Sequence, residues 1–188
     1  VRVEHNQEFI FLTLTAPNVK GEDLKSEIDR FNKAFKKLFD RRNVKKAVNG
    51  YVRKLEVKYN KERFITKEMY KNAQGYFDRR GLGIGDNNPN YDTYHPHIHA
   101  ILAVNKSYFT SRDYSKQEEW LAMWRECMED PSITQVDIRK VRSSEKSENG
   151  AVEEIAKYAA KSDEMYCAKS VFETFYRALK GRQLLTYN

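Results

Sequence analysis

The chain has 188 residues, and its 34 Lys and Arg against 27 Asp and Glu give a formal net charge of +7. This length suits one domain with a sizeable core, and an aromatic content of 13% excludes a disordered chain. The sequence contains no apolar run of about 20 residues, the length of a membrane span. Two cysteines, Cys127 and Cys167, are too few for a disulfide framework or a four-cysteine zinc site. We therefore expect a protein of the reducing cytoplasm with no membrane partner.

The positive charge and the aromatic content together favour a polyanionic partner. The chain has 12 Tyr and 10 Phe, and they are interleaved with Lys and Arg. Cations bind phosphates, and flat rings stack on unpaired bases, so nucleic acid is the first partner to consider. A run of cations is also typical of a solvated surface, so charge alone assigns no function.

The hydrophobic pattern predicts the element order strand, helix, strand, strand, helix, strand, followed by further helices. Alternation of apolar residues indicates the strands, and spacings of three and four indicate the helices. Ser115 is the expected cap of the second helix, with Glu118 three residues further on. The expected elements are a strand over 8–16, a helix over 21–48, a strand over 51–59, a strand over 95–104, a helix over 115–129, a strand over 133–141 and helices over 153–162 and 171–179.

This order defines an α+β fold of the split βαβ (ferredoxin-like or RRM-like) kind. It predicts a mostly antiparallel sheet with helices on one face, which leaves the other face for a ligand and the active site. Residues 60–92 form a long excursion between two strands, rich in Gly and Asn, and a loop of this length is usually functional or mobile. We expect one domain over 1–188. Because the chain begins with Val1 and stops without a cap, we also expect it to be a fragment of a longer protein.

Three of the four histidines alternate on one predicted strand. His95, His97 and His99 fall on one face of the strand, while Ile98 and Leu102 fall on a core face. Neighbouring imidazoles on one face can share a metal ion, and Glu56 on the preceding strand is the candidate carboxylate ligand. Two His and one carboxylate leave open positions for substrate oxygens, although zinc also accepts this set. The alternatives are a hydrogen-bonded histidine cluster and, for Glu56, an ordinary ion pair with a neighbouring lysine.

A second constellation lies on the helix predicted over 153–162. Glu154, Tyr158 and Lys161 are spaced so that they share one helical stripe, and Lys157 flanks it. A nearby cation would favour the phenolate of the tyrosine, and a carboxylate one turn away could activate water. Taken alone, this pattern is also that of an ordinary charged helix.

Four segments in order resemble the HUH endonucleases, and specifically the plasmid rolling-circle replication initiators of the Rep_1 type. Residues 11–18 (FLTLTAPN) look like the first motif of the family, and residues 54–60 (KLEVKYN) are similar to its next strand. Residues 95–102 (HPHIHAIL) look like the His-hydrophobic-His motif, and residues 153–161 (EEIAKYAAK) resemble the tyrosine motif. The resemblance covers most of the chain. The Cys-rich segment that family members carry ahead of the first motif is absent from this sequence.

The resemblance implies a site-specific DNA nicking and joining enzyme that starts plasmid replication. Tyr158 would form a 5′-phosphotyrosine link, Glu154 would activate water at termination, and Lys161 would stabilise phosphate charge. His97, His99 and Glu56 would hold one Mn²⁺ or Mg²⁺, with His95 beside them in support. The implied partners are single-stranded or hairpin DNA at a plasmid double-strand origin and a host replicative helicase, in the bacterial cytoplasm. The residues expected to contact DNA are Lys157 and, in the excursion, Arg63, Lys67, Arg79 and Arg80.

Other functions fit parts of the pattern. A transposase or a conjugative relaxase shares the superfamily chemistry and differs in its DNA substrate. A non-catalytic RRM-like module would stack bases on Phe9, Phe11 or Tyr51 without metal. A zinc hydrolase would use the histidines but would not need Tyr158.

Overall fold

A computed structural model describes residues 7–141 and 168–187 of the chain. The helix expected over 153–162, with Glu154, Lys157, Tyr158 and Lys161, lies outside the described residues. Among the described helices, none is long and apolar enough to cross a membrane. The elements are β1 (Gln7–Thr15), α1 (Leu24–Asp40), α2 (Arg42–Ala47), β2 (Val48–Asn60), α3 (Lys67–Asn72), α4 (Gln74–Asp78), β3 (Thr93–Asn105), η1 (Tyr108–Thr110), α5 (Gln117–Met128), β4 (Val136–Lys140), α7 (Lys169–Leu179) and β5 (Leu185–Tyr187).

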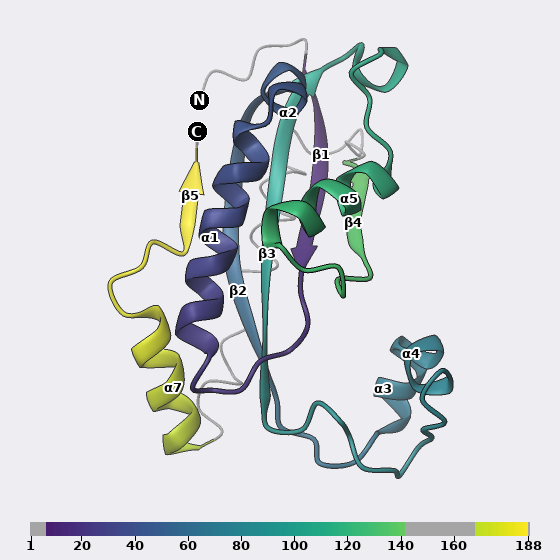
Figure 1. The fold of residues 1–188 in the computed structure, drawn as a ribbon, viewed down its shortest axis with the longest axis vertical. Coiled ribbons are helices and arrows are strands. Elements are labelled where there is room, and N and C mark those ends of the chain that lie inside the picture. Colours follow the sequence, from purple (N-terminus) through teal and green to yellow (C-terminus); the bar gives the residue numbers. More distant parts are fainter. Residues whose placement is uncertain (1–6, 142–167, 188) are drawn as a thin grey trace, which may run out of the picture.

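The sheet confirms the predicted α+β class. Its strand order is β4-β1-β3-β2-β5, and every neighbouring pair is antiparallel. The first four strands have the order and direction of a split βαβ fold, with β3 in the centre. The short strand β5 was not predicted and extends the sheet beyond β2 (Figure 1).

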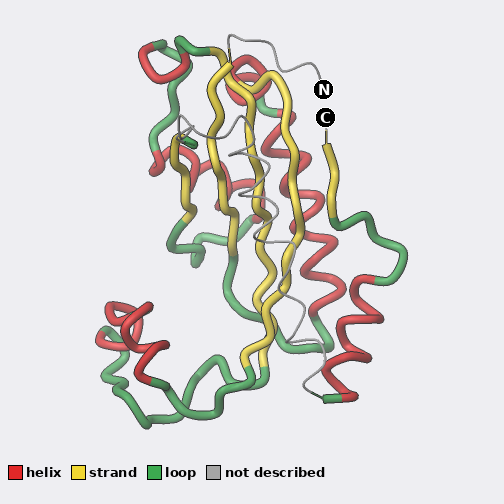
Figure 2. Tube along the Cα trace, turned by 180° about the vertical axis from the view of Figure 1, so that it is seen from behind, coloured by secondary structure: helices red, strands yellow, loops and turns green. Residues whose placement is uncertain are grey.

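The helices cover one face of this sheet, as Figures 1 and 2 show from opposite sides. Side chains alternate along a strand, so even-numbered residues of β1 and β3, such as Leu12 and Ile98, point into the helix layer. They meet α1 through Ile28 and Phe31 and meet α5 through Trp124, all fully buried. The core therefore fills one face of the sheet and leaves the odd-numbered side chains of β3 on the other.

The helix predicted over 21–48 is wrong in one respect, because the chain divides it into α1 and α2. Arg41 between them is extended, with φ −64° and ψ 136°. A continuous helix would carry its buried stripe from Leu38 onto Arg42 and Lys45. The break instead turns Val44 and Ala47 inward, and both are buried.

Two further boundaries differ from the sequence prediction. The cap of helix α5 is Lys116, one residue later than the expected Ser115. The N–H of Lys116 donates to the Glu119 carboxylate at 2.6 Å, so the pair Ser115 and Glu118 is not the cap. The last predicted strand is shorter, since only Val136–Lys140 pairs with β1. Ile133 is buried all the same, because it packs in the core before the strand begins.

The excursion 60–92 is an arm that extends beyond the ends of β2 and β3 (Figure 1). It contains the short helices α3 and α4 and a small centre of its own, formed by the buried Ile65 and Phe77. The buried Asn88 joins its two sides, since its N–H donates to the carbonyl of Arg63 and its side chain donates to the carbonyl of Glu62. The arm is thus ordered by local contacts rather than by the main core.

Candidate active site on the histidine strand

Strand β3 places the three alternating histidines on the face opposite the helices, as predicted. In the sheet register His97 lies opposite Glu56 of β2 and Thr15 of β1, and His99 lies opposite Thr13. The residues beside the histidines on this face therefore come from β1 and β2. They lie close to the histidines because β3 is the central strand between β1 and β2.

Glu56 and His99 are in direct contact. Nε2 of His99 lies 2.7 Å from Oε2 of Glu56, and both side chains are buried. On the other side of the ring, Nδ1 of His99 lies 3.1 Å from the hydroxyl of Thr13. Burial alone raises the pKa of the Glu56 carboxyl, but the His99 hydrogen bond and the charges of Lys58 and Lys54 outweigh it and hold that pKa below its ordinary value.

His97 and His95 are kept neutral. Burial, together with the neighbouring His95 and Lys58, lowers the pKa of His97 to about 2. Burial lowers the pKa of His95 to about 4. Their ring centroids are 4.0 Å apart, so protonating both rings would place two charges side by side. Neutral imidazole is the form that binds metal ions.

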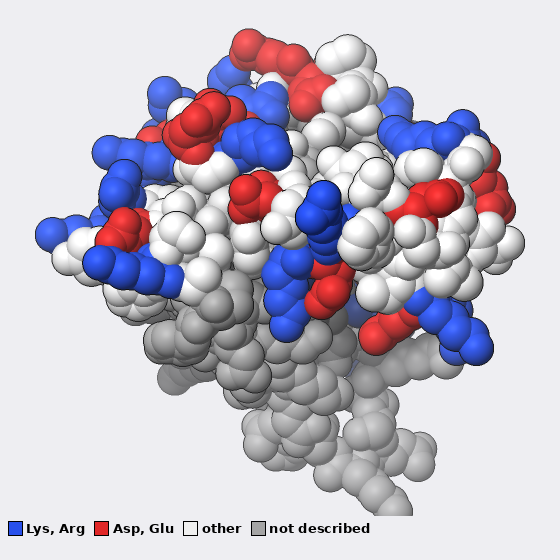
Figure 3. Space-filling view, turned by 90° about the horizontal axis from the view of Figure 1, so that it is seen from below, with Lys and Arg blue, Asp and Glu red and all other residues white. Residues whose placement is uncertain are grey.

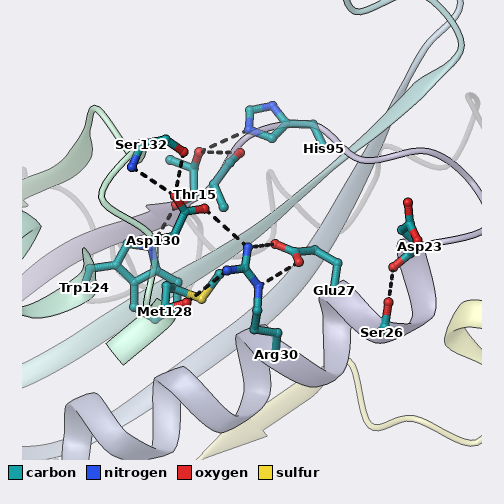
Figure 4. A network of polar contacts seen from close by, with 11 residues as sticks. Thr15, Asp23, Ser26, Glu27, Arg30, His95, Trp124, Met128, Asp130 and Ser132 are labelled. Atoms are coloured by element: carbon teal, nitrogen blue, oxygen red, sulfur yellow. Dashed lines mark hydrogen bonds and ion pairs between the residues drawn. The ribbon is translucent and has the colours of Figure 1, made fainter. Parts of the chain in front are cut away.

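Contacts from the helix layer hold the end of β1 beside His95 (Figure 4). The indole N–H of Trp124 donates to the carbonyl of Thr15 at 2.8 Å, and the hydroxyl of Thr15 lies 3.1 Å from Nε2 of His95. On the same motif, Asn18 donates to the hydroxyl of Thr93 at the start of β3. The first sequence motif thus positions the histidine strand, which explains why Thr and Asn stand there.

The predicted metal ligands suit a divalent cation in their chemistry. Two neutral imidazoles and one carboxylate are a common donor set, and Nδ1 of His97 is buried without a hydrogen-bond partner in the described part of the chain. Within residues 7–141 and 168–187, however, no three His, Cys, Asp or Glu side chains converge as they stand into a cation site. His97, His99 and Glu56 as ligands, with Mn²⁺ or Mg²⁺, therefore remain a prediction.

Sequence reasoning missed several residues of this face. Thr13 and Thr15 alternate on β1, so pairing β1 with β3 would have placed them beside the histidines. Lys54 and Lys58 were considered only as partners of Glu56, yet both share its face in the β2 register. On β4, Arg139 pairs with Phe11, and its guanidinium carbon lies 4.8 Å above the ring of Phe11.

Of the stacking residues proposed for an RRM-like module, Phe9 and Phe11 share one face of the sheet by their alternation on β1, and Tyr51 lies on the other face. Phe11 lies on the histidine face, with its ring 5.8 Å from that of His99. Tyr51 lies on the helix face, where it packs against Phe35 of α1. A base-stacking platform that uses both residues is excluded by this arrangement.

The expected DNA contacts of the excursion lie on the arm. Arg63, Lys67, Arg79 and Arg80 are all exposed. The guanidinium of Arg80 lies 3.9 Å from the ring centroid of Tyr76, which fixes its direction. In the view from below, Lys and Arg are interspersed with Asp and Glu over this end of the molecule (Figure 3). The geometry permits DNA contact by individual cations and leaves that contact untested.

The split βαβ sheet with three histidines on the central strand is consistent with the HUH endonuclease fold. Comparison with protein families then gives the assignment, because the model of the Rep_1 family, described as replication protein, matches residues 1–188. The chain belongs to this family of replication proteins.

Named relatives agree with the family. The chain is 39% identical over 171 residues to Protein rep of Staphylococcus aureus, a match that covers 90% of this chain and 61% of the relative. It is 32% identical to Protein rep of Streptococcus pneumoniae serotype 2 (strain D39 / NCTC 7466), over 100% of this chain and 51% of that protein. It is 34% identical to Protein rep of Bacillus amyloliquefaciens, over 95% of this chain and 50% of that protein. The chain therefore spans about half to three fifths of the length of these relatives. No solved structure matches the chain.

Proposed function

We propose that this chain carries the nicking and joining activity of a plasmid rolling-circle replication initiator. The observation that carries the proposal is the contact of Glu56 with His99 on the central strand of a Rep_1 protein, beside a His97 nitrogen that has no partner in the part of the chain that the structure describes. A base-binding module without catalysis gives no reason to place three alternating histidines on one face of the central strand, with one of them in contact with a buried carboxylate.

In this proposal the histidine face binds one Mn²⁺ or Mg²⁺ and the scissile phosphate. His97, His99 and Glu56 hold the cation, and Thr13 and Thr15 fix the directions of His99 and His95. When bound, the cation supplies charge that polarises the phosphate. Lys54 and Lys58 add positive charge along the same face.

The covalent step uses the tyrosine of the last motif. The phenol oxygen of Tyr158 attacks the phosphorus and forms a P–O bond, and the bond from phosphorus to the 3′ oxygen breaks. The phenol proton passes to solvent water, and the departing 3′ oxygen takes a proton from solvent to become the 3′-OH that primes synthesis. Lys161 and Lys157 stabilise charge on the phosphate, and at termination Glu154 accepts a proton from the water that releases the enzyme.

The substrate in this proposal is single-stranded or hairpin DNA at a plasmid double-strand origin. The arm contacts the DNA through Arg63, Lys67, Arg79 and Arg80. The DNA strand then crosses the histidine face, which is the face of the sheet that carries His95, His97 and His99. A host replicative helicase is the expected partner, because the nicked strand must be unwound from the 3′-OH. The plasmid origin and the helicase are both found in the bacterial cytoplasm.

The test is capture of the covalent intermediate. The protein is incubated with Mn²⁺ and a random-sequence single-stranded DNA library that carries a dye at its 3′ end. Because Tyr158 keeps the 5′ phosphate of the downstream piece, the dye should travel with the protein through denaturing electrophoresis. Mass spectrometry should place the nucleotide on the peptide that contains Tyr158.

Two variants separate the parts of the proposal. Tyr158→Phe should give no adduct yet keep DNA binding and the fold, and an adduct that persists in it would defeat the assignment of the nucleophile. His97→Ala should lose Mn²⁺ binding and nicking together. Nicking at the normal rate without bound Mn²⁺ would remove the metal from the proposal, and binding of DNA without any adduct would favour the non-catalytic module.

A further inference from the structure

A groove lies on the helix side of the sheet, where α1, α2, β2 and β5 meet (Figure 1). Its volume is about 850 Å³, within the range of small-ligand sites. Phe35 and Phe39 of α1 and Tyr51 of β2 form one wall. Because Arg53 and Lys54 alternate along β2, Arg53 points into this groove while Lys54 lies on the histidine face. The groove is therefore separate from the candidate active site.

Arg53 is a largely buried cation at the inner end of this groove. Its Nε donates to the hydroxyl of Thr186 at 2.8 Å, and its guanidinium carbon lies 4.4 Å from the ring centroid of Phe35. Its Nη1 is buried and has no hydrogen-bond partner within the described residues. Burial lowers the pKa of Arg53, but the guanidinium stays charged at any physiological pH.

No acidic group of the described lining compensates Arg53. The single acidic side chain there is Asp40, and its carboxylate pairs with Lys45 at 2.9 Å. Lys36 adds a further cation to the lining. Within the described residues the lining thus carries a guanidinium that no acidic side chain neutralises, and this favours an anionic ligand.

The rest of the lining indicates what accompanies the anion. Phe39 and Tyr51 are half-buried, with ring centroids 4.8 Å apart, and so offer apolar ring surface to the groove. The amides of Asn32 and Asn49 can donate and accept hydrogen bonds at a ring edge. A phosphate or carboxylate alone would engage Arg53 and leave this wall unused.

We propose that the groove binds a nucleotide, with its phosphate on the guanidinium of Arg53 and its base against Phe39 and Tyr51. The phosphate pairs with the guanidinium where Arg53 lines the groove, and Arg53 remains oriented by Thr186 and Phe35. The nucleotide is either free or the 5′-phosphorylated end of a DNA strand, and the two sources share this chemistry. The site lies on the opposite face from the histidines and does not depend on the proposed nicking activity.

The test measures binding of three probes to the metal-free protein by calorimetry and NMR. dAMP should bind with shift changes at Phe39 and Tyr51, while deoxyadenosine and inorganic phosphate should each bind at least about tenfold more weakly, because each lacks one half of the recognised group. A 5′-phosphorylated deoxyadenosine pentanucleotide identifies the source, since tighter binding than dAMP indicates a strand end and weaker binding indicates a free nucleotide.

Variants of Arg53 test its part in recognition. Arg53→Met keeps the length of the side chain and should weaken dAMP binding about tenfold or more, whereas Arg42→Met, an equal loss of charge on exposed α2, should leave it unchanged. Should Arg53→Met fail to fold, Arg53→Lys serves, because it keeps the charge and loses the planar fork, and it should weaken binding severalfold. Equal binding of dAMP and deoxyadenosine, binding unchanged by both Arg53 variants, or no binding of dAMP at millimolar concentration would overturn the proposal. Preference for an acidic peptide over dAMP would overturn it in favour of a protein partner.

Discussion

Glu56 contacts His99 diagonally across the sheet, rather than the residue directly opposite. The register pairs Glu56 with His97 and Lys54 with His99, yet the 2.7 Å contact joins Glu56 to His99. Diagonal neighbours on one face lie about 7–8 Å apart, within the reach of two longer side chains. The carboxylate thus spans two positions of β3, and Nδ1 of the directly opposed His97 has no hydrogen-bond partner among residues 7–141 and 168–187.

This contact also sets the tautomer of His99. A neutral His99 ring that faces ionised Glu56 has to carry its proton on Nε2 to donate to the carboxylate, and its Nδ1 is then the acceptor for Thr13. Ligation of a metal through Nε2 requires the other tautomer, in which Nδ1–H donates to Thr13. Thr13 can serve both states because a hydroxyl donates and accepts.

The first prediction concerns Thr13. Thr13→Val removes the hydroxyl at nearly constant shape and should weaken Mn²⁺ binding about tenfold, since loss of a group that orients a ligand typically costs 10–100-fold in affinity. Thr13→Ser should keep most of the affinity. Calorimetry measures the binding, and ¹⁵N NMR of the metal-free protein should show a changed proton distribution on His99 only in the valine variant. Equal affinity in the three proteins would show that Thr13 does not orient the ring.

Much of the fold was predictable because its strands have strong alternation. The residues of β1 and β3 separate cleanly into a buried apolar set and a second set that includes the histidines, so strand position, face and pairing order follow from the pattern. The break at Arg41 was not predictable from periodicity. The apolar residues keep a helical spacing only up to Leu38, and the position of Val44 depends on its packing against the sheet. Strand β5 is three residues long and has no alternation to detect.

The candidate site was predictable in its residues more than in its contacts. Alternation alone placed His95, His97 and His99 on one face, and proximity along the chain suggested Glu56. The diagonal choice of His99 over His97 depends on side-chain rotamers and could not be inferred from spacing. The threonine partners were missed because a Thr in a strand is ordinary until the pairing strand is known.

The second prediction is a loss of stability on mild acidification. The pKa of His95 falls from 6.5 to about 4 and that of His97 to about 2 in the folded chain. Below pH 6.5 these histidines therefore bind protons in the unfolded chain but not in the folded chain. Their contribution to stability is complete above pH 6.5 and decreases as the pH drops. Each histidine contributes at most about 1.4 kcal/mol per pH unit over this interval.

Urea unfolding in the presence of EDTA checks this prediction. The free energy of unfolding of the metal-free protein should fall between pH 6.5 and pH 4, and His97→Asn should reduce the slope. Carboxyls with a lowered pKa, such as those of Glu56 and Glu129, lose their contribution only as the pH approaches their ordinary value of 4.5, so the upper part of the interval reports the histidines. A free energy of unfolding that does not change down to pH 5 would show that the histidines are not buried in neutral form.

The third prediction concerns the ion pair of the partly exposed Arg30 with the buried Glu27, through which α1 also contacts the end of α5 (Figure 4). Nε and Nη2 of Arg30 donate to the two oxygens of Glu27, and Nη1 donates to the carbonyl of Met128. Arg30→Met leaves the Glu27 carboxylate, 7% exposed, without its cation, and should cost about 1–3 kcal/mol of stability. The double variant Glu27→Leu with Arg30→Met should recover part of this loss, because it removes the Glu27 charge while Asp130 still loses its contact with Arg30. Urea unfolding measures all three proteins, and a double variant no more stable than the single one would contradict the explanation.

The fourth prediction concerns termination and follows from the proposed role of Glu154. Glu154→Gln keeps the size of the side chain and removes the base, so the covalent Tyr158 adduct should form at a normal rate and release about a hundredfold more slowly, within the usual effect of one general base. A pulse of dye-labelled DNA followed by an unlabelled chase measures release. Normal release from the glutamine variant would assign the activation of water to another group.

The last prediction concerns the arm as a DNA contact. Arg79→Gln with Arg80→Gln removes two exposed cations and should weaken single-stranded DNA binding about equally for all sequences. The slope of log affinity against log salt should fall by about 1.4, because each contact on a single strand contributes about 0.7. The matched control is Lys169→Gln with Arg177→Gln on α7, because it removes the same number of positive charges from a helix outside the arm. Fluorescence anisotropy at several salt concentrations measures the slopes. Equal slopes for the arm variant and the wild type would exclude Arg79 and Arg80 from the interface. A separate experiment tests whether the arm also recognises the DNA sequence. If it does, exchange of residues 60–92 between two relatives should transfer the preference for an origin.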